Sequence, residues 1–145
     1  MKDVNAGGGI AIGGTKQRVQ LVIRDNASNP AMATQQVRTL VQQDHAVALL
    51  GAVTPPLTIP MSSIADALQT PLISGLTPIR AWLGGSKSGW KYSWDFFIDE
   101  LAFTNQQFDV SSLAKTNKKI ALFTDNEEDG VAPPGGATPH STDRP

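Results

Sequence analysis

Residues 46–77 constrain the fold of this chain more than any other stretch of its sequence. A short apolar run at residues 47–50, which Gly51 ends, is typical of a strand covered on both faces. A second short strand is predicted at Leu72 and Ile73. Between the two strands, apolar residues recur at the spacing of one helix face, at Leu57, Met61, Ile64 and Leu68. A strand, a helix and a strand of this length predict a right-handed crossover between two parallel strands.

The segments before this stretch continue the alternation of strands and helices. Residues 18–25 alternate apolar and polar side chains, which predicts a strand. Residues 30–43 predict a helix, with Pro30 at its first position and Ser28 or Asn29 as its cap. Residues 2–6 resemble the last turn of a helix that the glycines at 7–9 terminate. This order predicts an α/β fold with a parallel sheet, whose ligands bind at the carboxyl ends of the strands, here residues 51–56 and 74–77.

The second half of the chain carries weaker signals. Residues 75–89 are predicted to form a loop, and residues 90–96 a strand with its aromatic side chains on one face. For that face, packing beneath a helix is favoured over stacking on a ligand. Residues 99–116 partly keep a helical period, residues 119–124 predict a strand and residues 125–130 an acidic loop. Pro and Gly dominate residues 131–145, which are therefore expected to be disordered.

The composition argues against several classes of function. A net charge of −1, with no block of either sign, gives no electrostatic basis for binding nucleic acid or a membrane surface. No apolar run reaches the length of a transmembrane helix, so direct membrane insertion is not expected. No signal peptide is recognisable at the start of the chain. The lack of cysteine excludes disulfides and thiolate sites.

No cofactor, metal site or catalytic group is expected. The glycines between residues 7 and 14 lack the phosphate-loop pattern, because Thr15 and Lys16 stand in the reverse order. The acidic loop at residues 125–130 lacks the ligand spacing of an EF-hand. Neither histidine, His45 or His140, belongs to a catalytic or metal-binding set within a predicted ordered segment. An enzyme is therefore not expected.

Four segments follow one another in this chain: DVNAGGGI, VQLVIRDNASNPAMATQQVRTLVQQDHAVALLGAVT, IADALQTPLIS and NKKIALFTDNEEDG. Their order and spacing resemble the periplasmic substrate-binding proteins of ABC transporters, type I fold, in the branched-chain amino acid and amide (leucine-binding protein-like) subclass. The resemblance covers about residues 3–130. It implies an α/β fold with a parallel sheet flanked by helices, in two lobes that crossover strands join. A small-molecule ligand would be trapped between the lobes by hinge closure.

The resemblance implies a division of the chain into three parts. Residues 1–98 would form an incomplete N-terminal lobe, without the first strand and most of the first helix. Residues 99–130 would contain the crossover and the start of the second lobe, and residues 131–145 the disordered tail. The chain is therefore expected to be a piece of a longer binding protein, with most of lobe one and the start of lobe two.

The resemblance also implies ligand-binding residues in two loops of the first lobe. The hydroxyl of Thr54 would hold a ligand carboxylate at a helix N-terminus, although the prolines at 55 and 56 remove two N–H donors there. The alternative role of Thr54 is to cap the helix. In the second loop, Thr77 is the first candidate, followed by Ser74 and by Leu76, which lies between them. The alternative is a polar loop at a strand end with no role in binding.

A third loop would contribute Asp129 from the second lobe. In the resembling family this position is most often a tyrosine, which forms an aromatic wall of the ligand site. An acid in its place favours a ligand with hydroxyls or a cationic group over an aliphatic amino acid. The alternative is a solvated acidic turn.

The resemblance implies the solute-binding component of an ABC importer. Its ligand would be a small polar molecule, such as an amino acid or an amide, and its protein partners the permease subunits of the transporter. Its location would be periplasmic or extracellular. A ligand-sensing domain of a receptor or regulator with the same fold is the alternative.

Overall fold

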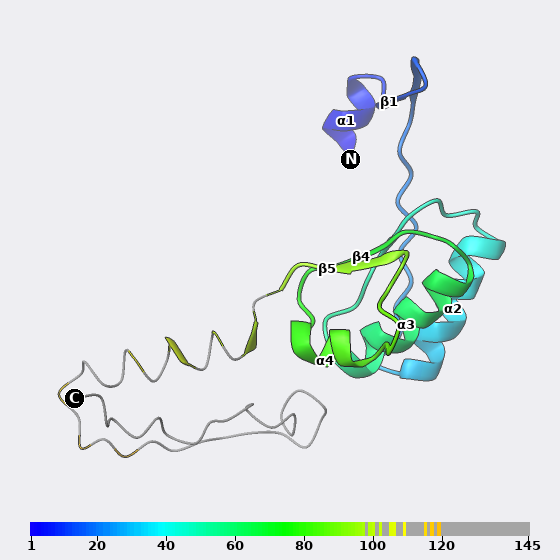
Figure 1. The fold of residues 1–145 in the computed structure, drawn as a ribbon. Helices are drawn as coiled ribbons and strands as arrows, with labels where there is room; N and C mark the ends of the chain where they lie inside the picture. The colour runs from blue at the N-terminus through cyan, green and yellow to red at the C-terminus, as the bar shows by residue number, and fades with distance from the viewer. Residues whose placement is uncertain are drawn as a thin grey trace.

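The computed structural model describes residues 1–97, 99, 100, 102, 105, 106, 109, 115, 117 and 119. Helices and strands alternate along this part of the chain (Figure 1). They are α1 (Lys2–Ala6), β1 (Ile10–Ile12), β2 (Thr15–Gln17), α2 (Pro30–Gln42), β3 (Leu49–Leu50), α3 (Pro55–Ala67), β4 (Leu72–Ser74), α4 (Ile79–Gly84) and β5 (Ser93–Asp95).

The strands β3, β4 and β5 form a parallel sheet, and α3 connects β3 to β4. Leu49 is the partner of Leu72 in the first pair, and Ser74 is the partner of Asp95 in the second. The predicted strand, helix and strand within residues 46–77 are therefore confirmed. The helix of this unit, α3, begins at Pro55, whose fixed φ and missing N–H suit the first helical turn.

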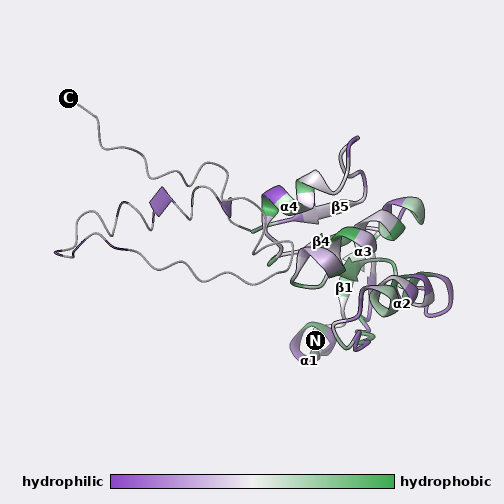
Figure 2. Cartoon of the chain, turned by 90° about the horizontal axis from the view of Figure 1, so that it is seen from below, coloured by the Kyte–Doolittle hydropathy of each residue, from purple (hydrophilic) through white to green (hydrophobic). Residues whose placement is uncertain are grey.

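One face of the sheet packs against α3, and α3 in turn packs against α2. Helices α2 and α3 both carry apolar stretches, drawn in green in Figure 2, and both contribute to the buried core. Burial of a side chain such as Leu72 contributes about 1.5–3 kcal/mol. The buried apolar cluster consists of Ala33, Val37, Leu49, Leu57, Met61, Ala65 and Leu72.

The opposite face of the sheet is exposed. Leu50 is 74% exposed, and its partner Ile73 and the partner of Ile73 on the next strand, Trp94, are also exposed. The prediction that residues 47–50 form a strand covered on both faces is therefore wrong. Figure 1 gives the reason, because α3 and α4 both lie on the same side of the sheet.

The aromatic stretch at residues 90–96 is divided between two environments. Only Ser93–Asp95 form a strand, and the side chains of Trp94 and Phe96 are exposed. Trp90 instead stacks on Trp82 of α4, with the ring centroids 5.7 Å apart. The prediction of one aromatic face packed beneath a helix is therefore wrong for Trp94 and Phe96.

Helix α4 lies within residues 75–89, where a loop was predicted. The buried side chain of Trp82 fixes this helix against α3, because its Nε1 donates a hydrogen bond of 3.0 Å to Ser62 Oγ. The carbonyl of Trp82 also accepts a 3.0 Å hydrogen bond from Trp90 Nε1. A buried indole with its N–H satisfied explains how so short a helix is held in place.

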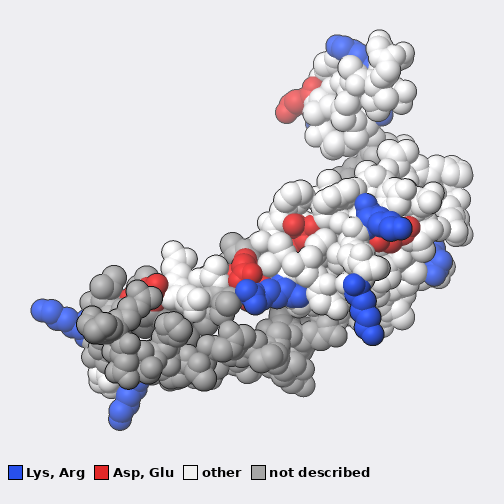
Figure 3. All heavy atoms as spheres, in the orientation of Figure 1, with Lys and Arg blue, Asp and Glu red and all other residues white. Residues whose placement is uncertain are grey.

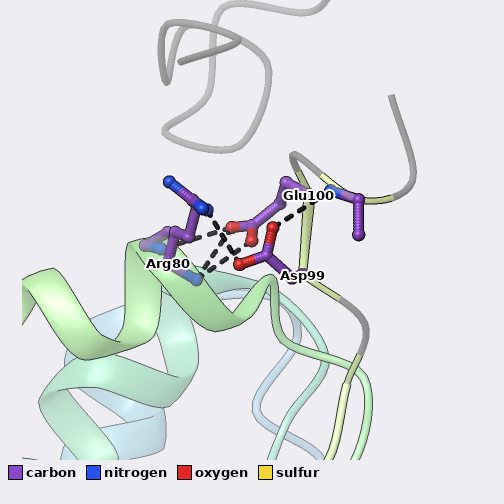
Figure 4. A network of polar contacts seen from close by, with 5 residues as sticks. Arg80, Asp99 and Glu100 are labelled. Carbon is purple, nitrogen blue, oxygen red and sulfur yellow. Dashed lines mark hydrogen bonds and ion pairs between the residues drawn. The ribbon is translucent and has the colours of Figure 1, made fainter. Parts of the chain in front are cut away.

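The first turn of α4 also holds the chain beyond β5 (Figure 4). The backbone N–H of Arg80 donates hydrogen bonds of 3.0 Å to both carboxylate oxygens of Glu100. The Arg80 guanidinium forms an ion pair of 2.9 Å with Asp99. Acidic side chains satisfy the free N–H groups at a helix start, which accounts for this arrangement.

Helix α2 begins as predicted, with Asn29 as its cap and Pro30 in its first turn. The side-chain oxygen of Asn29 accepts a hydrogen bond of 2.9 Å from the backbone N–H of Met32. An uncharged cap of this kind satisfies one of the N–H groups that have no partner within the helix.

Residues 18–25 were predicted to form a strand, and the structure assigns them none. They instead run as a single connection between the body of the molecule and the N-terminal unit of α1, β1 and β2 (Figure 1). Within that unit β1 and β2 form an antiparallel hairpin, which was not predicted. Its turn is Gly13 and Gly14, both at positive φ, as a tight two-residue hairpin requires.

Several predictions fall outside the described residues and remain predictions. They are most of the helix at 99–116, the strand at 119–124, the acidic loop at 125–130 and the tail at 131–145. The division of the chain at residues 98–99 and 130–131 remains a prediction for the same reason.

Candidate functional site

The carboxyl ends of β3, β4 and β5 meet at one edge of the sheet. The parallel register places Gly51, Ser74 and Asp95 there, each at or directly after the last residue of its strand. The loops that follow β3 and β4 carry the predicted residues Thr54, Leu76 and Thr77. The structure therefore brings the two predicted loops of the first lobe together at this edge.

Thr54 occupies the cap position of α3, and its side chain forms no capping hydrogen bond. Neither Pro55 nor Pro56 has an N–H to offer, and the N–H of Leu57 already donates to the Thr54 carbonyl at 3.1 Å. The start of α3 therefore lacks the row of free donors that binds anions at other helix N-termini. The half-buried hydroxyl of Thr54 is the donor that remains.

The hydroxyls of Ser74 and Thr77 point into the protein. Ser74 Oγ lies 3.0 Å from Thr77 Oγ1 and donates to the Ala52 carbonyl at 3.0 Å. Thr77 Oγ1 donates to Thr58 Oγ1 at 2.8 Å. Ser74 is 2% exposed and Thr77 is 0% exposed. These hydroxyls join the loop after β4 to α3 and to the loop after β3, so in this conformation they fix the loops in position.

Between these two anchors, Gly75 and Leu76 form the exposed tip of the loop. Their backbone N–H groups have no hydrogen-bond partner within the described part of the chain. The tip therefore presents backbone N–H donors at the sheet edge. The residues on either side of it, Ser74 and Thr77, are held in place by buried hydrogen bonds. A ligand oxygen is the complementary partner for such donors.

Asp95 also lies at this edge, and it was not among the predicted site residues. Its side chain is on the same face of the sheet as that of Ser93, directed toward α3. The residue is 8% exposed, and neither carboxylate oxygen has a hydrogen-bond partner in the described structure. Burying a charged group without a partner is costly. The only signal in the sequence was an acid at the end of a predicted strand.

Asp66, unlike Asp95, has a carboxylate whose oxygens both accept hydrogen bonds. It accepts hydrogen bonds from the backbone N–H groups of Lys91 and Tyr92, at 2.9 and 2.8 Å. A weaker contact of 3.4 Å joins it to the hydroxyl of Ser93. Asp66 therefore ties the end of α3 to the start of β5, at the end of the sheet opposite the edge that carries Ser74 and Asp95.

Asp129, the candidate in the third loop, lies outside the described residues. Within the described chain, no group of three or more His, Cys, Asp or Glu side chains is arranged to hold a metal ion. Charged side chains of both signs are dispersed over the face shown in Figure 3. No helix among the described residues has the length and apolar character needed to cross a membrane.

A family model described as "Periplasmic binding protein" matches residues 1–138. The chain belongs to this family. Its fold is the type I fold of periplasmic binding proteins, here a parallel sheet flanked by helices and only part of the whole fold. No curated protein sequence matches the chain.

Solved structures of substrate-binding proteins share this fold. A substrate-binding protein of an ABC transporter from Desulfitobacterium hafniense, in complex with Leu, is 16% identical with a TM-score of 0.70. The match covers 92% of this chain and 38% of that protein. The branched-chain amino acid transporter protein LivJ from Streptococcus pneumoniae, in complex with isoleucine, is 22% identical with a TM-score of 0.58. That match covers 74% of this chain and 31% of LivJ.

A third structure shares the fold and carries a different kind of ligand. It is a solute-binding protein from Rhodopseudomonas palustris in complex with 3,4-dihydroxybenzoic acid, 15% identical with a TM-score of 0.55, covering 73% of this chain and 28% of that protein. The chain thus spans about a third of the length of the solved structures it matches. All three ligands carry a carboxyl group.

Proposed function

We propose that this chain is part of the solute-binding component of an ABC importer, and that it binds a small carboxylate-bearing solute, such as an amino acid. The observation that carries this proposal is the family match over residues 1–138, together with the sheet edge where Thr54 and residues 74–77 meet. Binding would involve no chemical step.

The donors at the sheet edge support a carboxylate as the recognised group. The hydroxyl of Thr54 and the N–H groups of Gly75 and Leu76 have no partners in the described chain, and all three are neutral donors that a carboxylate accepts from. Ser74 and Thr77 act through the loop that they anchor. Their role is therefore to position the donors, and the ligand contacts fall to Thr54 and the 75–76 backbone.

The remaining parts of the proposal follow the family. A second wall of the site, with Asp129 as its candidate residue, would close over the ligand by a hinge motion that the ligand stabilises through contacts made only in the closed state. Permease subunits would be the protein partners, and the periplasm or the cell exterior the location.

Titration calorimetry with L-leucine and three analogues tests the proposal. We expect L-leucine and 4-methylpentanoate, which both carry the carboxylate, to bind, and leucinamide and 3-methylbutylamine to bind at least about tenfold more weakly. The variant Thr54→Val, which removes the hydroxyl and keeps the shape, should weaken binding by about tenfold through a lost charge-assisted hydrogen bond. The control Thr39→Val, on α2, should leave the affinity unchanged. Equal binding of leucine and leucinamide would contradict the proposal.

A further inference from the structure

The edge of the sheet that carries the candidate site also holds a buried acid that the proposed function does not use. Asp95 is the last residue of β5 and pairs with Ser74, the last residue of β4. The pairing continues beyond it, because the N–H of Phe96 donates to the Ser74 carbonyl at 3.1 Å. Neighbouring strands lie about 5 Å apart, so the carboxylate is within about 10 Å of the loop tip at Gly75 and Leu76, which follows Ser74 directly.

No described group compensates the charge of this carboxylate. Asp95 is 8% exposed, and neither of its oxygens has a hydrogen-bond partner in the described structure. It forms no ion pair within the described part of the chain. The Ser74 hydroxyl, on the same face of the sheet, hydrogen-bonds with the Ala52 carbonyl and Thr77 instead. A buried charge without such partners is costly, and a cation placed near it lowers that cost.

The same charge affects which anions the site can hold. The donors proposed for a carboxylate are the hydroxyl of Thr54 and the N–H groups of Gly75 and Leu76, and all of them are neutral. A carboxylate bound by these groups is repelled by Asp95, whereas a cationic group on the same solute is attracted to it. Near a protein surface, two unit charges about 10 Å apart interact strongly enough to change an affinity by about tenfold.

We propose that Asp95 makes this site selective for solutes that carry a cationic group beside their carboxylate, such as α-amino acids, over simple carboxylates. Both oxygens of Asp95 are buried, so it acts on the solute through its charge and not by direct contact. The inference rests on the proposed function, because it places the solute carboxylate at Thr54 and the 75–76 backbone. The ammonium group of the solute then compensates the charge that the described chain leaves unpaired.

Titration calorimetry with matched pairs of solutes tests this role. The pairs are L-leucine and 4-methylpentanoate, L-phenylalanine and 3-phenylpropanoate, and L-alanine and propanoate, and the members of each pair differ only in the ammonium group. The natural protein should bind the amino acid at least about tenfold more tightly than its partner. Asp95→Asn keeps the shape and removes the charge, so it should lower this ratio by about tenfold, mainly because the simple carboxylate binds more tightly.

The ratio separates an effect of charge from an effect on folding. Both members of a pair are measured on the same variant, so a change in the folded fraction cancels from the ratio. Asp3→Asn, on the exposed helix α1, removes the same charge elsewhere and should leave the ratio unchanged.

The possible outcomes distinguish this inference from the proposed function. A ratio that stays the same in Asp95→Asn, or equal binding of the two members by the natural protein, would overturn the role of Asp95. The proposed function would then stand, since carboxylates still bind. Absence of binding by every member of the three pairs would count against the proposed function and this inference together.

Discussion

The hydroxyl of Thr77 donates a 2.8 Å hydrogen bond to the hydroxyl of Thr58, and both side chains are fully buried. The two residues are 19 positions apart in the sequence, one in the loop after β4 and the other in α3. This contact, together with the Ser74 hydroxyl, determines where the loop tip at Gly75 and Leu76 lies. A polar cluster within the protein thus sets the geometry of the edge where we place the ligand.

The first prediction concerns this hydroxyl pair. Thr77→Val should lower the free energy of unfolding by about 1–3 kcal/mol, because it leaves Thr58 and Ser74 buried with a partner removed. The double variant Thr58→Val, Thr77→Val should lose less free energy of unfolding than the two single variants lose together. We expect the difference to be about 0.5 kcal/mol or more, because neither hydroxyl of the pair remains without its partner. Urea denaturation followed by circular dichroism measures both. Strict additivity would show that the pair is not coupled.

The second prediction compares two aspartates that differ in their partners. Asp95→Asn should raise the free energy of unfolding by about 1 kcal/mol or more, because it removes a buried charge whose oxygens have no partner in the described structure. Asp66→Asn should lower it by about 1 kcal/mol, because Asp66 accepts backbone hydrogen bonds with both of its oxygens. Thermal unfolding of both variants shows directly whether each substitution raises or lowers the stability of the protein. A loss of stability in Asp95→Asn would mean that the carboxylate has a stabilising partner.

A third prediction concerns the link between α3 and β5. Asp66→Ala removes the acceptor for the N–H groups of Lys91 and Tyr92 and should destabilise the protein by about 1–3 kcal/mol. Asp3→Ala, an exposed aspartate on α1, is the control and should change stability by no more than about 0.5 kcal/mol. Hydrogen exchange should also show faster exchange at Lys91 and Tyr92 in Asp66→Ala. Equal effects of the two alanine variants would argue against this role for Asp66.

The fourth prediction concerns the start of α2. Asn29→Ala removes the side-chain oxygen that accepts the Met32 N–H and should cost about 1 kcal/mol of stability. Asn29→Asp keeps that oxygen and adds a charge that suits a helix start, so it should retain the stability of the natural protein. Denaturant unfolding compares the three proteins, because a change in the midpoint at an unchanged m-value is a change in stability. A loss in Asn29→Asp as large as in Asn29→Ala would exclude the capping role.

The sequence predicted the central unit of the fold because local and global signals agree there. Apolar spacing in residues 57–68, Pro30 and Asn29 at a helix start, and short apolar runs around 47–50 and 72–73 each correspond to an element of the structure. The strand at residues 18–25 was not found, although its alternation is clear. A strand needs a neighbour to pair with, and residues 20–23 have none in the described chain.

The sequence predicted where the loops of the candidate site lie, but it predicted only in part what each residue in them does. The loops that contain Thr54 and Thr77 do meet at the carboxyl edge of the sheet. The sequence could not show that Thr77 and Ser74 direct their hydroxyls inward, because that depends on Thr58 and the Ala52 carbonyl, which come from other elements. Asp95 was not predicted at all, since burial of one acid within an aromatic stretch is a property of the packed sheet.

The measurement that tests the central claim most directly is a chemical-shift map of the isotope-labelled chain titrated with L-isoleucine. A solute bound at the sheet edge should shift the amide signals of residues 51–54 and 75–77 in a saturable way, and leave those of residues 20–24 unchanged. Saturable shifts confined to another part of the chain would contradict a carboxylate site formed by Thr54 and the 75–76 backbone.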